Sequence, residues 1–181
     1  MQDENVPALH GIDTRLLTKK IRDKGAMLGK IVMEGDEAGE GLPMLDPNER
    51  NLVAEVSCKE VQTHGAGNPH KVLAVHCGLK ENMIRMLVQR GAEVRVVPWD
   101  YPALVDDYKN WADGLFLSNG PGDPGHPALA PLVASLKEIV NLPESSGKIK
   151  PIFGICLGNQ LLSLAADAKS YKLPFGNRGQ N

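Results

Sequence analysis

The chain has 181 residues, of which 42% are hydrophobic, and a formal net charge of -2. This length suits one large domain, or one domain with part of a second, and the hydrophobic fraction is sufficient for a core. The small net charge gives no reason to expect a nucleic acid or an anionic membrane as a partner. No apolar run approaches the roughly 18 residues that a membrane-spanning helix requires. These features are typical of a globular protein.

The cysteines and the first residues bear on the compartment. Cys58, Cys77 and Cys156 are odd in number, far apart, and form no Cys-x-x-Cys pair. We therefore expect neither a disulfide framework nor a zinc site. We expect the protein to lie in a reducing compartment. Residues 1–5 are acidic and polar, unlike a signal peptide or an Arg-rich transit peptide.

The first third of the chain predicts few regular elements. Asp13 can cap a helix over 14–24, which has apolar residues on one face and Gly25 as its end. Residues 28–33 predict a short strand, and 52–56 predict a small element. The segment between these two elements is polar and rich in turn-forming residues.

A change in composition predicts a domain boundary. Residues 63–69, Thr-His-Gly-Ala-Gly-Asn-Pro, have the composition of a linker. We place the linker at 65–70, which separates an N-terminal domain over 1–64 from a second domain over 71–181.

After the linker, strand and helix patterns alternate. Strands are expected at 72–76, 93–98, 114–118 and 152–155, helices at 81–90, 127–142 and 157–168, and an irregular or short helical segment at 101–111. This alternation predicts an α/β fold with right-handed crossovers and a parallel sheet covered by helices on both faces. Binding sites in such sheets lie beyond the carboxyl ends of the strands. Three of these ends carry candidate residues: 76–78, 118–124 and 156.

Residues 151–160 hold the strongest chemical motif. Gly154, Cys156 and Gly158 form Gly-x-Cys-x-Gly between a predicted strand and a predicted helix, which is the cysteine form of a nucleophile elbow. A sharp turn there requires small neighbours, and the start of a helix in general favours a thiolate and offers N–H groups to an oxyanion. The alternative is an inert cysteine buried in the core.

The segment 118–124, Ser-Asn-Gly-Pro-Gly-Asp-Pro, predicts a stiff loop. Its two glycines and two prolines leave backbone that can approach a ligand closely. An ordinary Pro-Gly turn is the alternative. Since this loop and Cys156 follow strands of one parallel sheet, one backbone N–H from each could form an oxyanion hole.

Two segments closely resemble the class I glutamine amidotransferases. They are 116–124, Phe-Leu-Ser-Asn-Gly-Pro-Gly-Asp-Pro, and 153–160, Phe-Gly-Ile-Cys-Leu-Gly-Asn-Gln. The similarity is greatest to the glutaminase domain of carbamoyl-phosphate synthases. Residues 11–18 look like the end of the small N-terminal domain of those enzymes, and 168–172 and 177–179 also fit. The resemblance covers nearly the whole chain, and it implies a class I amidotransferase-like fold preceded by part of that small domain.

The resemblance implies roles for individual residues. Cys156 would attack the carboxamide carbon of L-glutamine, release ammonia and form a glutamyl thioester that water hydrolyses. The backbone N–H groups of Gly120 and Leu157 would bind the oxyanion. Gly122 and Gln160, together with the two oxyanion residues, would bind the glutamine.

The resemblance also implies a partner. Ammonia would pass to a synthetase portion, in cis or in trans, which makes carbamoyl phosphate for pyrimidine or arginine and urea synthesis. ATP and Mg²⁺ would belong to that portion, so no cofactor or metal is expected in this chain. The compartment expected is the mitochondrion or the cytoplasm.

The departures from the family pattern bear on activity. The family places its base in a His-x-Glu segment far downstream of the cysteine, whereas here no histidine follows His126 and the only acidic residue after Cys156 is Asp167. Asn159 stands where the family usually has His, and His76 stands where it usually has Asp. We therefore expect a chain truncated at both ends and inactive alone. His76 lies at the carboxyl end of a predicted strand and His126 lies beside the glycine loop, but a histidine there is more often a structural group than a substitute base.

Three hypotheses remain open. The first is the amidotransferase part of a glutamine-hydrolysing carbamoyl-phosphate synthase. The second is a non-catalytic module of the same fold that docks to a synthetase partner. The third is a different hydrolase with a cysteine elbow, against which the loop at 118–124 and the Asp-Thr-Arg segment at 13–15 both argue.

Overall fold

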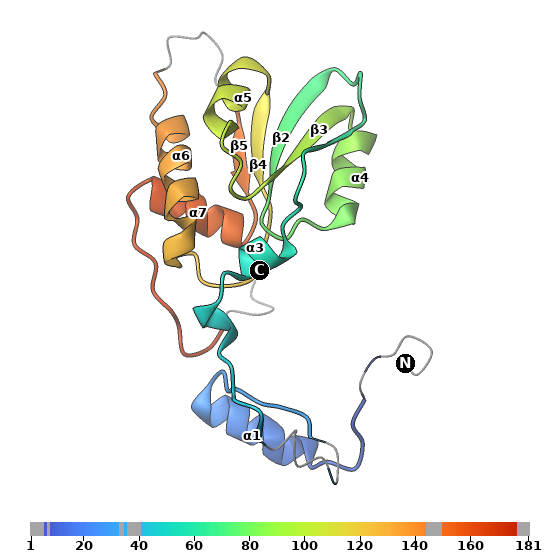
Figure 1. Ribbon diagram of the computed structural model, residues 1–181, viewed down its shortest axis with the longest axis vertical. Coiled ribbons are helices and arrows are strands. Elements are labelled where there is room, and N and C mark those ends of the chain that lie inside the picture. Colours follow the sequence, from blue (N-terminus) through green and yellow to red (C-terminus); the bar gives the residue numbers. More distant parts are fainter. Residues whose placement is uncertain (1–5, 7, 33–34, 36–40, 144–149, 177–181) are drawn as a thin grey trace. The chain divides into compact units, whose positions relative to one another are not determined.

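The computed structural model describes residues 6, 8–32, 35, 41–143 and 150–176. The chain divides into two compact units, Met1–Leu45 with Tyr171–Asn181, and Asp46–Ser170 (Figure 1). The second unit contains the predicted linker at 65–70. The assignment of 1–64 and 71–181 to two family domains stays a prediction.

The first unit contains helix α1 (Thr14–Lys24). As predicted, the Asp13 carboxylate caps it by accepting a 2.8 Å hydrogen bond from the Leu16 N–H, and Gly25 ends it with φ of 80°. The strand predicted at 28–33 is wrong for 28–32, and residue 33 lies outside the described residues. A strand requires a partner to pair its N–H and C=O groups, and the described part of this unit offers none.

The second unit is built on a five-stranded sheet in the order β1-β3-β2-β4-β5. The strands are β1 (Gln62–His64), β2 (His70–His76), β3 (Ala92–Pro98), β4 (Gly114–Leu117) and β5 (Ile152–Gly154). β2 to β5 run parallel, which confirms the predicted parallel α/β sheet. β1 pairs antiparallel with β3 and was not predicted, because its three residues lie beside the glycine-rich linker.

Helices cover both faces of this sheet (Figure 1). α5 (Leu104–Asn110), α6 (Ala130–Val140) and α7 (Leu157–Ala165) pack on one face, and α4 (Glu81–Gln89) packs on the other. The unit also contains α3 (Leu52–Val56) and two 3₁₀ helices, Pro47–Glu49 and Pro127–Leu129. The predicted helix over 127–142 is therefore a 3₁₀ turn followed by α6.

The last helix is shorter than predicted. Asp167 takes φ of 62°, and the N–H of Ala168 donates to the Ser163 carbonyl at 2.9 Å. A left-handed residue with such a bond closes a helix, so α7 ends at Ala165 rather than at residue 168.

The central strands are buried on both faces. Leu73 and Val75 of β2 belong to the core under α5, α6 and α7, whereas Ala74 between them belongs to the core under α4. Such strands appear as continuous apolar runs, which is why the sequence revealed them. β5 forms the end of the sheet, where Phe153 stacks on Phe116 with ring centroids 6.3 Å apart and stays 61% exposed. Among the described residues, no helix combines the length and apolarity needed to span a bilayer.

Candidate active site

Cys156 lies in a strained turn between β5 and α7. Its φ of 52° and ψ of -111° fall in a region that residues with a β-carbon rarely occupy. The flanking glycines make this turn possible. A β-carbon on Gly154 would lie 2.6 Å from the Asn159 nitrogen, and one on Gly158 would lie 2.7 Å from the Leu117 carbonyl carbon. The structure therefore confirms the predicted strand–turn–helix elbow.

The three cysteines differ in accessibility. Cys156 is exposed, Cys58 is partly buried and Cys77 is fully buried. Burial raises the pKa of the Cys77 thiol to about 12, and burial is also the main cause that raises the pKa of Cys58. The alternative of an inert core cysteine therefore fits Cys77 and does not fit Cys156.

The start of α7 joins the elbow to the neighbouring strand. The Gly158 N–H donates to the Ser118 carbonyl at 3.1 Å, and the Ile155 N–H donates to the Leu117 carbonyl at 3.0 Å. Leu157 is the first helical residue, so its N–H has no acceptor within the helix. This N–H is available at the same edge of the sheet as the Cys156 thiol.

The glycine loop contacts both other strand ends. A β-carbon on Gly120 would collide with the Cys77 carbonyl oxygen and lie 2.7 Å from Cδ2 of Leu157. Within the described part of the chain, the Gly120 N–H donates to no protein acceptor. The ends of β2, β4 and β5 therefore meet at one edge, as predicted. Gly120 and Leu157 lie together there.

The two other predicted substrate contacts differ in how they are connected to the elbow. Gln160 is exposed in the first turn of α7, and its N–H donates to the Cys156 carbonyl at 3.1 Å. Gly122 has φ of 88°, and a β-carbon there would have only Leu52 of α3 within 4 Å. No described hydrogen bond joins Gly122 to Cys156 or Gln160. Their roles as substrate contacts stay predictions.

Neither His76 nor His126, the two histidines weighed as substitute bases, is hydrogen-bonded to the Cys156 thiol among the described residues. His76 ends β2 half-buried, its Nδ1 has no partner there, and burial is the main cause that lowers its pKa. His126 caps the 3₁₀ helix at Pro127–Leu129, since its Nδ1 accepts a 3.2 Å bond from the Ala128 N–H. That bond occupies the nitrogen and gives His126 a structural role.

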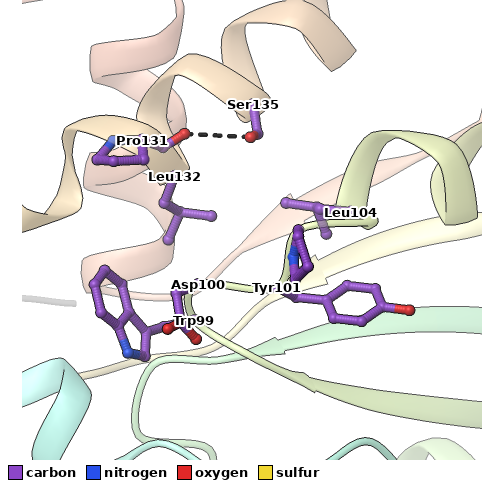
Figure 2. Close-up of a pocket in the computed structure, with 8 residues that line it drawn as sticks. Trp99, Asp100, Tyr101, Leu104, Pro131, Leu132 and Ser135 are labelled. Carbon is purple, nitrogen blue, oxygen red and sulfur yellow. Dashed lines mark hydrogen bonds between the residues drawn. The ribbon is translucent and has the colours of Figure 1, made fainter.

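A cavity of about 150 Å³ lies between the segment after β3 and helix α6 (Figure 2). Figure 2 shows Trp99, Asp100 and Tyr101 opposite Pro131, Leu132 and Ser135. The cavity contains none of the predicted site residues. Sequence reasoning missed it because its walls come from an irregular segment and a distant helix.

Sequence reasoning also missed the buried hydroxyl groups at this edge. The Ser118 hydroxyl accepts a 2.9 Å bond from the Cys77 N–H, and the Ser57 hydroxyl accepts a 3.1 Å bond from the Trp99 N–H. The sequence signal was the serine that opens the glycine loop. Its hydrogen-bond partner lies 41 positions away and could not be inferred from that signal.

Comparisons with known proteins show which sequences this chain is similar to. The family model "Glutamine amidotransferase class-I" matches residues 73–181, and the model "Carbamoyl-phosphate synthase small chain, CPSase domain" matches residues 1–31. The chain is 52% identical over 182 residues to "Carbamoyl-phosphate synthase [ammonia], mitochondrial" of Rattus norvegicus. It is 51% identical over 181 residues to "Multifunctional protein CAD" of Squalus acanthias, and 44% identical over 191 residues to "Multifunctional protein pyr1-3" of Dictyostelium discoideum. Each alignment covers 100% of this chain, but only 11%, 8% and 8% of the respective relatives.

Proposed function

Because the chain belongs to the class I glutamine amidotransferase family, we propose that it supplies the glutaminase chemistry of a carbamoyl-phosphate synthase. One observation carries this proposal. An exposed cysteine occupies a strained elbow, beside a glycine loop whose backbone reaches the next residue, Leu157. A nucleophile beside unpaired N–H donors is the arrangement that acyl transfer requires.

The reaction uses few groups of this chain. The Cys156 sulfur attacks the carboxamide carbon of L-glutamine, and the N–H groups of Gly120 and Leu157 bind the oxygen as it becomes negative. The C–N bond then breaks, ammonia leaves with the thiol proton, and a γ-glutamyl thioester remains. Water hydrolyses the thioester to glutamate and restores the thiol. Gly122 and Gln160 hold the substrate in this proposal.

The ammonia requires a consumer. We propose that a synthetase portion, in the same or another chain, uses it with ATP and Mg²⁺, which act there and not in this chain. The names of the relatives, carbamoyl-phosphate synthase and multifunctional protein, support a large assembly around this segment. The compartment proposed is the mitochondrion or the cytoplasm, since the name of the rat relative includes the word mitochondrial.

A second candidate is a non-catalytic module that docks to the same synthetase portion. One observation favours it: no imidazole is hydrogen-bonded to the Cys156 thiol among the described residues. In this alternative the elbow would be kept as part of the fold, and the chain would contribute binding without turnover.

Affinity labelling distinguishes the two. We expect a diazoketone analogue of L-glutamine to alkylate Cys156, with protection by L-glutamine and none by D-glutamine. The variant Cys156→Ser should lose the labelling, and Cys58→Ser should keep it as the matched control. Labelling of Cys156 without protection by L-glutamine would favour the non-catalytic module.

A further inference from the structure

Ser118 is the residue through which the three strand ends of the site are joined. Its side chain is 0% exposed, directly after β4. The hydroxyl accepts from the Cys77 N–H at 2.9 Å and donates to the Asn119 carbonyl at 2.8 Å. The Ser118 carbonyl accepts from the Gly158 N–H at 3.1 Å. One residue therefore contacts the end of β2, the glycine loop and the elbow helix.

The hydroxyl acts on the peptide unit that carries the oxyanion donor. The Asn119 carbonyl belongs to the same planar peptide group as the Gly120 N–H, so a bond to one fixes the direction of the other. The Asn119 side chain adds a second restraint, since its Nδ2 donates to the Gly78 carbonyl at 3.2 Å. Both hydrogen bonds therefore restrain this peptide group through Asn119.

The backbone contacts around the loop bear on the orientation of the 119–120 peptide group. A β-carbon on Gly78 would lie 3.0 Å from Cα of Gly120 and 3.1 Å from the Asn119 oxygen. Backbone therefore packs on backbone here, and Cδ of Pro121 also lies 3.3 Å from the same position. Rotation of the 119–120 peptide group is opposed by these hydrogen bonds and by these contacts.

We propose that Ser118 is a positioning residue for the oxyanion site, whose hydroxyl holds the 119–120 peptide group so that the Gly120 N–H faces the carbonyl attacked by Cys156. This inference rests on the proposed function. It adds a residue that does not touch the substrate and acts through Gly120. Loss of the hydroxyl removes one restraint on the peptide group and leaves the thiol and the elbow in place.

Two reactions of the same thiol provide the test. With p-nitrophenyl acetate, Cys156 forms a thioester through a tetrahedral oxyanion and releases p-nitrophenolate. With iodoacetamide, the thiolate displaces iodide and no oxyanion forms. The ratio of the two rate constants therefore reports the oxyanion site separately from the thiol. Both are measured on the full 181-residue chain in a Cys58→Ser background.

We expect Ser118→Ala to lower the acylation rate about 10-fold or more, since loss of one oxyanion donor costs about 10²–10³. Alkylation should change less than about 2-fold. Ser118→Thr keeps the hydroxyl and should retain most of the acylation, whereas Ser118→Val has the same shape without the hydroxyl and should not. Ser57→Ala is the matched control, since its hydroxyl also accepts a strand-end N–H, that of Trp99.

The outcomes are decisive in each case. An equal effect of Ser118→Ala on both reactions, or no effect on either, overturns the positioning role. If Ser118→Ala and Ser118→Val unfold while Ser118→Thr stays folded, the hydroxyl serves stability, and this outcome also overturns the positioning role. Acylation by the γ-glutamyl p-nitrophenyl ester tests the proposed function separately from the positioning role of Ser118. If that ester acylates Cys156 no faster than the acetate does, glutamine recognition fails while the Ser118 result stands.

Discussion

A β-carbon on Gly154 would lie 2.6 Å from the carbonyl carbon of Gly158. The two glycines of the Gly-x-Cys-x-Gly motif are therefore in direct backbone contact across the cysteine between them. This contact lets β5 turn sharply into α7, and it forces Cys156 into its φ of 52°. The motif is a packing requirement on both sides of the nucleophile.

Gly158→Ala should destabilise the Asp46–Ser170 unit by about 3 kcal/mol or more, because its β-carbon would meet backbone atoms of Leu117 that cannot move aside. Chemical denaturation followed by circular dichroism measures this. Gly125→Ala is the matched control, since its β-carbon would approach only the Asp123 carboxylate, at 3.3 Å. Equal stability of both variants would contradict the packing argument.

Cys156 should react first when the native chain meets a limiting amount of iodoacetamide, because it is the exposed thiol. Cys58 should react more slowly, since burial is the main cause that raises its pKa, and Cys77 should react only after unfolding. Peptide mapping after brief labelling checks the order. Equal labelling of all three thiols, or preferential labelling of Cys58, would contradict this order.

Cys77 should make stability depend on alkaline pH. Its pKa is raised from 9.0 to about 12 in the folded state, so the neutral thiol is favoured by folding. This contribution is fully present below pH 9.0 and is lost as the pH rises through about 12. We expect the stability of the wild type to fall faster than that of Cys77→Ala over this window, by about 1.4 kcal/mol per pH unit. If the stabilities of the two proteins fall in parallel as the pH rises, the proposed effect of Cys77 is refuted.

The 181-residue chain should release negligible glutamate from L-glutamine. A neutral thiol is a poor nucleophile, and an amide nitrogen leaves poorly without a proton. No imidazole among the described residues is hydrogen-bonded to the Cys156 thiol. General acid–base help alone is worth roughly 10²–10⁴ in rate. The measurement is steady-state glutamate release, with Cys156→Ser as the control.

Turnover that depends on Cys156 and reaches about 1 s⁻¹ would contradict this prediction. It would show that the chain supplies its own base. His76→Ala would then identify that base, since the Nδ1 of His76 has no partner in the described part of the chain.

Sequence alone determined the features that depend on neighbouring residues. Asp13 and Gly25 define the two ends of α1, because capping acts within one turn of the helix. The two glycines around Cys156 predicted the elbow, because the turn needs small residues at fixed spacing. The class I amidotransferase family could be recognised for the same reason, since its motifs are local.

The features that depend on distant residues became visible in the three-dimensional fold. Residues 28–32 have a strand-like composition and form no strand, whereas 62–64 pair with β3 across the linker. The exposure of Cys156 and the bond from Cys77 to Ser118 likewise join segments far apart in the chain. Strand pairing, burial and side-chain bonds between strand ends are set by which segments meet in space, and local spacing carries no information about that.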